Sequence, residues 1–194
     1  MAEPTKTELR AEILLARHAL APHLHDAEAD ALCGHLPAFI SGGQTVCAYM
    51  PIGSEPGSPE LIDSLVHRGV RVLLPVVRHD EAGLRVPLQW GEYRPGGLVE
   101  ARFRLREPPE PWLPADAIAA ASVVLVPALA VDRAGVRLGR GAGFYDRSLP
   151  LAAPTAQLVA VVRDDEIVDR LPAEPHDVRM THALTPNGGL VALG

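Results

Sequence analysis

Residues 127–147 hold the side chains whose types and spacing are best suited to chemistry, in the stretch PALAVDRAGVRLGRGAGFYDR. Three glycines, Gly139, Gly141 and Gly143, alternate with other residues, and Arg137 and Arg140 lie beside them. Glycine lacks a Cβ, so the backbone N–H groups of such a loop can approach an anion closely. Arginine adds forked donors that match phosphate. The pattern therefore predicts a binding site for a phosphorylated ligand.

The charge of this stretch favours a polyphosphate. Between residues 132 and 147, four arginines and two aspartates give a local charge of +2, whereas the whole chain carries −6. A helix predicted to begin near Gly141 would add the positive end of its dipole. A tight glycine-rich turn with solvated arginines is the alternative, and the bare cluster does not decide between the two.

Two common nucleotide-binding motifs are excluded. A P-loop requires a lysine within its GxxxxGK[ST] pattern, and Lys6 is the sole lysine among the 18 lysines and arginines of the chain. The Rossmann pattern GxGxxG would need its third glycine at position 144, which is Phe144. A nucleotide bound here would therefore need a different kind of loop.

The reactive stretch follows a predicted buried strand, Ser122–Val126, with the sequence SVVLV. A turn is expected at Asp132–Gly135, before the glycines. In open α/β sheets ligands bind beyond the carboxyl ends of the strands. The loop therefore lies where a binding site is expected.

The N-terminal segment predicts an amphipathic helix over residues 5–20. Thr5–Glu8 has the spacing of a capping box, and apolar residues follow at helical intervals. Lys6 and Arg10 are four residues apart and share one face of this helix. Arg17 is expected to lie away from the site in the same helix. A solvated helix face is the ordinary interpretation of such cations.

The remaining pattern predicts one α/β domain over residues 1–194. It is a three-layer α/β/α arrangement with a mostly parallel, mixed sheet, Rossmann-like in class. Further helices are expected from about Asp26 to Ile40, ended by Ser41–Gly43, and from Ser58, a capping residue, to Arg68. The predicted strands are Thr45–Met50, Val70–Leu74, Leu84–Trp90, Ser122–Val126, Ala156–Val162 and Met180–Leu184.

Composition excludes several classes of partner and site. The net charge of −6 argues against nucleic acid or an anionic membrane as a partner. Cys33 and Cys47 are too few for a disulfide framework or a cysteine zinc site. No signal peptide is visible, and the longest uncharged run, Ala117–Val131, is too short to span a bilayer. We expect a cytoplasmic protein. The sequence does not determine its oligomeric state, and a monomer is slightly favoured.

The 127–147 stretch closely resembles a segment of the 5-formyltetrahydrofolate cyclo-ligase (methenyltetrahydrofolate synthetase) family. Other family features follow in the same order along nearly the whole chain: the Lys6, Leu9 and Arg10 opening, Tyr49–Glu55, Phe103–Pro108 and the His176–Asp177 pair. Departures from the family pattern are Arg104, Ala142, Phe144 and Thr181. Thr181 replaces a residue that is often acidic, which could weaken an outer contact to a metal.

The resemblance implies an ATP- and Mg²⁺-dependent ring closure. In the family, 5-formyltetrahydrofolate and ATP give 5,10-methenyltetrahydrofolate, ADP and phosphate. The formyl oxygen attacks the γ-phosphate, and N10 then displaces phosphate from the resulting imidate phosphate. Such a reaction depends on positioning and charge neutralisation and needs no covalent nucleophile on the protein.

The resemblance also implies roles for particular residues. Arg140 and Tyr145 are the expected catalytic residues, and Asp146 and Asp177 the expected Mg²⁺ ligands. The expected ATP-binding residues are Lys6, Arg10, Arg137, Gly139, Arg140, Gly141, Gly143, Phe144 and Tyr145. The expected folate-binding residues are Met50, Glu55, Arg140, Gly141, Gly143 and Phe144, with Phe103, Phe144 and Tyr145 forming an apolar slot for the pterin.

Each role has a plainer alternative. Asp146 and Asp177 could cap helices or pair with arginines, Glu55 could be an exposed loop charge, and Met50 could be a core residue. His18, His23 and His25 are expected to be surface histidines, and no role is assigned to Trp90 or Trp112. For the whole chain, the alternatives are a non-catalytic folate- or nucleotide-binding paralogue, or another small-molecule kinase or sugar-phosphate enzyme on a similar fold.

Overall fold

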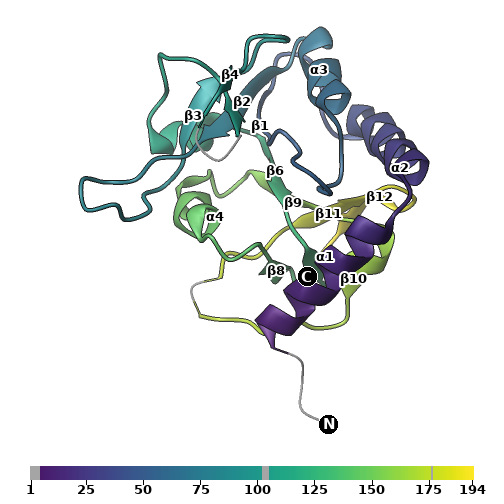
Figure 1. Ribbon diagram of the computed structural model, residues 1–194. Helices are drawn as coiled ribbons and strands as arrows, with labels where there is room; N and C mark the ends of the chain where they lie inside the picture. Colours follow the sequence, from purple (N-terminus) through teal and green to yellow (C-terminus); the bar gives the residue numbers. More distant parts are fainter. Residues whose placement is uncertain (1–4, 102–104, 176) are drawn as a thin grey trace.

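A computed structural model of the chain describes residues 5–101, 105–175 and 177–194. Within these residues the main sheet has seven strands (Figure 1). In spatial order they are β12 (Gly189–Ala192), β11 (His182–Thr185), β9 (Gln157–Val161), β6 (Val123–Pro127), β1 (Thr45–Cys47), β2 (Arg71–Val76) and β3 (Gln89–Glu92). The five inner strands pair in parallel, and the edge strands β12 and β3 pair antiparallel. The predicted mostly parallel, mixed sheet is confirmed.

Alternating side chains of the inner strands fill two cores, one on each face of the sheet. Val46 and Leu125 belong to the core beneath α2 (Pro22–His35) and α3 (Pro59–His67). Their neighbours Cys47 and Val124 belong to the opposite core, which is completed by η3 (Ala115–Ala120), α4 (Phe144–Ser148) and η4 (Leu149–Leu151). Strands covered on both faces read as continuous apolar runs, which is why SVVLV stood out in the sequence. The predicted three layers are confirmed.

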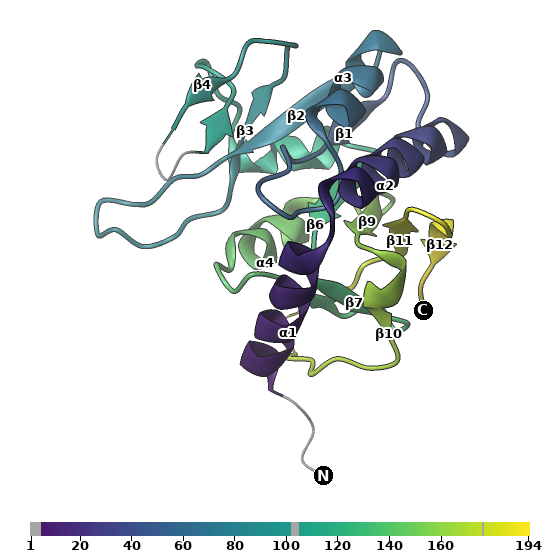
Figure 2. The ribbon, with the colours of Figure 1, turned by 45° about the vertical axis from the view of Figure 1, so that its right-hand side comes forward.

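A smaller three-stranded sheet continues from the carboxyl end of β6. Its strands are β10 (Ile167–Val168), β7 (Ala130–Asp132) and β8 (Arg137–Leu138), and η5 (Asp164–Glu166) precedes β10. Helix α1 (Lys6–Ala19) packs Leu9, Ile13 and Leu14 against a core that includes Leu129 and Leu138. Figure 2 shows α1 lying alongside β7 and β10. The N-terminal helix therefore lies next to the β8–α4 loop that carries the glycines.

Most predicted boundaries hold, for local reasons. Thr5 and Glu8 form the capping box at the start of α1, and Ser58 accepts a hydrogen bond from the backbone N–H of Leu61 at the start of α3. The predicted turn at Asp132–Gly135 is present, because Asp132 is buried and accepts hydrogen bonds from Ala134 N and Val136 N. These signals are local in sequence, so they could be identified before the tertiary structure.

Several predicted boundaries are wrong, including the end of the strand Thr45–Met50, which stops at Cys47. The second helix begins at Pro22, where proline occupies the first helical turn, and ends at His35, before the 3₁₀ turn η1 (Leu36–Ala38). The predicted strand Leu84–Trp90 forms only from Gln89. The helix expected near Gly141 begins at Phe144, because Gly141 and Gly143 have φ angles of 92° and 73°, which a helix does not allow.

Two aromatic residues without an assigned role are structural. Trp90 is fully buried in β3 and its indole N–H donates to Ala115 O. Trp112 donates to Pro108 O and lies under the Arg78 guanidinium, 3.7 Å from the ring centroid.

The segment before Trp112 contains a short antiparallel pair of strands, β4 (Val99–Glu100) and β5 (Arg106–Glu107). In the described part of the chain no helix is long and apolar enough to cross a membrane.

Candidate active site

A pocket of about 250 Å³ opens at the carboxyl ends of β1, β2 and β6. Its wall is built from α1, the loop after β1, the junction between β6 and β7, and the β8–α4 loop. It brings together every described residue predicted from the sequence to act on ATP, folate or metal: Lys6, Arg10, Met50, Glu55, Arg137, Gly139, Arg140, Gly141, Gly143, Phe144, Tyr145, Asp146 and Asp177. The individual roles of these residues remain predictions.

The glycine loop is held against α1. Arg10 Nε donates to Gly139 O at 2.8 Å. A Cβ added to Gly141 would lie 3.5 Å from the guanidinium carbon of Arg10, and the positive φ there already disfavours other residues. The loop backbone and the Arg10 side chain therefore form one surface, suited to an anion.

Cations and carboxylates are already paired on the side of the pocket formed by α1 and the glycine loop. Only 6% of the Arg137 side chain is exposed, and it donates to Asp146 Oδ1. Lys6 Nζ lies 3.1 Å from Glu174 Oε1 and 3.6 Å from Asp177 Oδ2. Each candidate metal ligand, Asp146 or Asp177, is thus paired with a candidate phosphate-binding cation. Bound phosphate would compete with these carboxylates for the same cations.

The two carboxylates fit magnesium only in part. Their hard oxygen donors suit Mg²⁺, which commonly takes one or two carboxylates together with phosphate oxygens and waters. No group of three histidine, cysteine or acidic side chains that could hold a metal occurs among residues 5–101, 105–175 and 177–194. A bound Mg²⁺ would therefore depend on the oxygens of a nucleotide as well as on Asp146 and Asp177.

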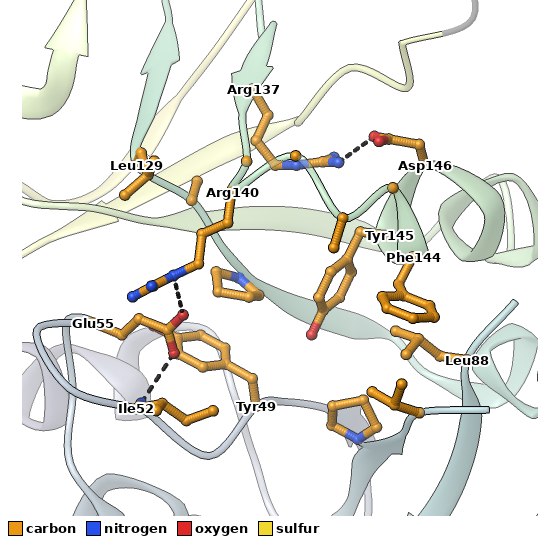
Figure 3. Close-up of a pocket in the computed structure, with 18 of the residues that line it drawn as sticks. Tyr49, Ile52, Glu55, Leu88, Leu129, Arg137, Arg140, Phe144, Tyr145 and Asp146 are labelled. Carbon is orange, nitrogen blue, oxygen red and sulfur yellow. Dashed lines mark hydrogen bonds and ion pairs between the residues drawn. The ribbon is translucent and has the colours of Figure 1, made fainter. Parts of the chain in front are cut away.

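A buried carboxylate faces the glycine loop from the opposite wall (Figure 3). Glu55 Oε1 accepts from Arg140 Nε at 3.0 Å, and Oε2 accepts from Ile52 N at 3.0 Å. Burial raises the pKa of Glu55, and the nearby Arg140 guanidinium offsets part of this effect. The alternative of an exposed loop charge is excluded, since Glu55 is buried.

Tyr145 points its hydroxyl into the same pocket (Figure 3). The oxygen is buried and has no hydrogen-bond partner among the residues that the structure describes. Burial raises the pKa of this phenol, so it stays protonated and can donate a hydrogen bond. A buried hydroxyl without a partner in a pocket is suited to a ligand atom or an ordered water.

Other aromatic and histidine contacts refine the predicted slot. Phe144 packs edge-on against the His79 ring, with centroids 5.7 Å apart. His25 is partly exposed at the surface, and its imidazole is within hydrogen-bonding distance of Glu55 O, at 3.1 Å. Thr181 bonds to the backbone of Leu158 and does not line the pocket. Phe103, Arg104 and His176 lie outside the described residues.

Sequence reasoning missed Arg17, and the expectation that it lies away from the site is wrong. Arg17 is buried, lines the pocket and pairs with Glu166. A signal was available, since at 3.6 residues per turn positions 6, 10 and 17 fall within about 40° of one another around a helix. Glu107 also lines the pocket, accepting from Val77 N at 2.7 Å. Its signal was the family feature Phe103–Pro108, in which this glutamate was given no role.

Known proteins of similar sequence or structure share one family description. A protein of Mycolicibacterium smegmatis named 5-formyltetrahydrofolate cyclo-ligase is 61% identical over 193 residues, covering 100% of both chains. One of Escherichia coli with the same name is 32% identical over 145 residues, covering 74% of this chain and 78% of the relative. Among solved structures, the 5,10-methenyltetrahydrofolate synthetase of Aquifex aeolicus superposes with a TM-score of 0.79 at 23% identity, covering 96% of this chain and 92% of that one.

A structure from Mycoplasma pneumoniae, described as a 5,10-methenyltetrahydrofolate synthetase, gives a TM-score of 0.68 at 20% identity and covers 90% of this chain and 94% of that one. At these identities the structural likeness supports the fold. The family itself rests on sequence: the pattern that defines it matches residues 2–186. With that match and the relative at 61% identity, the chain belongs to the 5-formyltetrahydrofolate cyclo-ligase family, a family of enzymes.

Proposed function

We propose that this protein converts 5-formyltetrahydrofolate and ATP to 5,10-methenyltetrahydrofolate, ADP and phosphate, with Mg²⁺ as cofactor. Membership of the family supports the reaction. The observation that carries it furthest is the contact between Arg140 and Glu55 at 3.0 Å. It joins a loop suited to phosphate and a buried carboxylate suited to the N–H groups of a pterin across one pocket.

The proposed chemistry is a phosphoryl transfer followed by ring closure. The formyl oxygen attacks the γ-phosphorus of ATP, and the bond between this phosphorus and the bridging oxygen of ADP breaks. ADP leaves, and the formyl group on N5 becomes an imidate phosphate. N10 then attacks the activated formyl carbon, a proton leaves N10, and inorganic phosphate departs. The formyl oxygen ends in the phosphate, so atoms and charge balance. The amide oxygen is a weak nucleophile, so the protein must position it and neutralise the charge on the phosphates.

The cationic side of the pocket is suited to the triphosphate. We assign Lys6, Arg10 and Arg137, with the backbone of the glycine loop, to the phosphates. Arg140 is our candidate for the transferred phosphoryl group, because its half-exposed guanidinium can leave Glu55 and donate to phosphate oxygens. A donor aimed at the charge that develops in the transition state accelerates the reaction, whereas uniform binding only lowers KM.

The opposite side of the pocket is suited to the folate. Glu55 would accept from pterin N–H donors, and Met50 and Phe144 supply apolar surface in the same pocket. The protonated Tyr145 hydroxyl is placed to donate to the formyl or phosphate oxygen, since it points into the pocket without a protein partner among the described residues. These roles follow from the donor and acceptor properties of the side chains.

Mg²⁺ bound with the nucleotide would neutralise phosphate charge during transfer. Asp146 and Asp177 are the residues of this chain that would hold it. Both already face the cations that would bind phosphate, so nucleotide binding would release these carboxylates for the metal.

One assay tests the proposal. Purified protein with 5-formyltetrahydrofolate, ATP and Mg²⁺ is followed for methenyl product by absorbance and for ADP by a coupled enzyme. We expect one ADP per methenyl product and no turnover when either substrate or Mg²⁺ is omitted. ATP hydrolysis at a comparable rate without folate would contradict the coupled mechanism. Binding of both substrates without product would instead identify a non-catalytic paralogue.

A further inference from the structure

Three cations of α1 project toward the pocket, and they differ in how firmly they are held. Lys6 and Arg10 lie near the glycine loop and the two candidate metal carboxylates. Arg17 lies at the other end of the helix and is almost fully enclosed, with 1% of its side chain exposed. The same helical face thus carries two accessible cations and one enclosed cation.

Arg17 has three hydrogen bonds within the protein. Nε donates to Glu166 Oε1 at 2.6 Å, and Nη2 donates to Glu166 Oε2 at 2.7 Å and to Ala128 O at 2.7 Å. Glu166 Oε2 also accepts from Arg163 N at 2.7 Å. The guanidinium therefore ties α1 both to the segment before β10 and to the junction of β6 and β7.

That junction is connected through β7 and β8 to the glycine loop. Ala128 and Leu129 alone separate β6 from β7, and Leu129 N donates to Leu138 O of β8 at 2.8 Å. Gly139, the first residue of the glycine loop, comes directly after Leu138, and its carbonyl oxygen accepts a hydrogen bond from Arg10 Nε. Helix α1 and the loop are thus joined at two points, by Arg17 at the base of the loop and by Arg10 on the loop itself.

Stability alone is a weak reason for such a pair. Burying two charges costs desolvation energy, and replacing a buried pair by uncharged residues is often neutral or stabilising. The apolar contact of α1 with the small sheet is non-directional and permits sliding, whereas a forked guanidinium with three fixed acceptors does not. The directional hydrogen bonds of Arg17 and Glu166 are therefore suited to fixing the position of α1.

We propose that Arg17, with Glu166, is a positioning residue for nucleotide binding: it fixes α1 so that Lys6 and Arg10 meet the phosphates held by the glycine loop. This inference rests on the proposed function. Arg17 itself keeps its protein partners throughout, and its effect reaches ATP through the placement of the other two cations.

The test separates positioning from stability with two variants. Arg17→Met leaves the Glu166 carboxylate buried without its partner, so it should lower Tm strongly. Adding Glu166→Gln removes that stranded charge and keeps an oxygen for Arg163 N. We expect the double variant to recover most of the Tm, while KM for ATP and Kd for Mg·ADP stay roughly five- to tenfold above wild type and KM for folate changes less than about twofold.

The matched control is Glu28→Gln, which breaks the outer ion pair with Arg163, whose Nε lies 3.0 Å from Glu28 Oε2. Neither Glu28 nor Arg163 lines the pocket, so nucleotide affinity should stay at the wild-type value. If the double variant binds Mg·ADP as wild type does, or if both KM values rise equally, the positioning role is overturned. Failure of the wild-type protein to bind Mg·ADP by calorimetry would overturn the proposed function as well.

Discussion

Two arginine–glutamate pairs meet the same pocket and differ mainly in their access to solvent: Arg17 alone of the first pair lines it, whereas Arg140 and Glu55 both do. Arg17 and Glu166 are enclosed, with 1% and 5% of their side chains exposed, and are 2.6 Å apart. Arg140 and Glu55 are 3.0 Å apart, and 47% of the Arg140 side chain is exposed. The first pair joins helix to sheet, and the second joins two walls that face each other across the pocket.

The difference in exposure suggests different roles. An enclosed pair has no access to solvent, and separating it would leave a charge buried. An open pair can exchange one partner for another, since water screens the intermediate arrangement. Phosphate could thus draw Arg140 from Glu55 and leave a buried carboxylate for the donors of the folate. Under the proposed function, ATP and folate would then favour each other's binding, and by an equal factor.

Arg140→Ala is expected to have the largest effect on turnover. Loss of one donor to the transferred phosphoryl group should lower kcat roughly 10²- to 10³-fold, with a smaller change in ATP affinity. Steady-state kinetics and Mg·ADP titration would measure the two separately. Arg133→Ala is the control, since Arg133 is well exposed and belongs to the preceding turn. Near-normal kcat in Arg140→Ala would reduce this arginine to a turn residue.

Glu55→Gln should affect the folate side alone. Loss of charged hydrogen bonds to the pterin is expected to raise KM for folate roughly 10- to 100-fold, while KM for ATP changes little. Glutamine keeps the volume, so the loop should be retained. Equal increases in both KM values would indicate a disturbed loop and contradict the assignment.

The pH dependence of folate use should carry the signature of Glu55. Burial raises its pKa above the ordinary 4.5, so kcat/KM for folate should fall as pH decreases through that raised pKa. Because the pKa of Glu55 is higher in the folded protein than in the unfolded chain, folding favours its protonated form. The stability that this protonated group contributes is lost as pH rises through the folded-state pKa. Glu55→Gln should therefore lack the acid limb and melt no lower than wild type at neutral pH. A retained acid limb would assign it to another group.

Lys6→Arg should have a modest effect that is confined to ATP. Guanidinium is wider than ammonium and would crowd a loop already lined by arginines, so we expect KM for ATP to rise roughly two- to fivefold. Lys6→Ala should raise it further, with Tm almost unchanged in both. Arg133→Lys is the control, since Arg133 is well exposed and does not line the pocket. Unchanged ATP kinetics would make Lys6 a solvated helix charge.

The smallest effect is expected at a third pair, Arg71–Glu92, which is 3.0 Å apart and about half exposed on both sides. Exposed pairs of this kind contribute roughly 0–1 kcal/mol. Arg71→Ala should therefore shift Tm by less than about 4 °C and leave both KM values unchanged. A larger decrease in Tm would show that solvent exposure does not predict how much each of these ion pairs contributes.

Local signals were enough for much of the fold. The capping box at Thr5, the Ser58–Pro59 helix start and the apolar strand around Val124 each depend on neighbours in the chain. The small sheet was missed because its short strands are stabilised by partners that are distant in sequence. The pairing of β7 with β10, for example, joins Val131 to Ile167. The edge strand β12 was also missed, although it forms a local hairpin with β11 through a turn that contains Asn187 and Gly188.

For the site, the sequence by itself determined which side chains are present and how the glycine loop must behave. The alternating glycines, the arginines beside them and the family resemblance all depend on spacing along the chain, and every described residue chosen in this way lines one pocket. Their individual roles await the experiments above.

The tertiary structure alone decided which charges are paired and which are enclosed. Arg17 meets Glu166 across 149 positions and Arg140 meets Glu55 across 85, and no pattern along the chain gives these partners. Burial is likewise a property of the packed molecule, because desolvation depends on atoms from every neighbouring element. The sequence supplied two similar arginines, and packing enclosed one of them and left the other about half exposed.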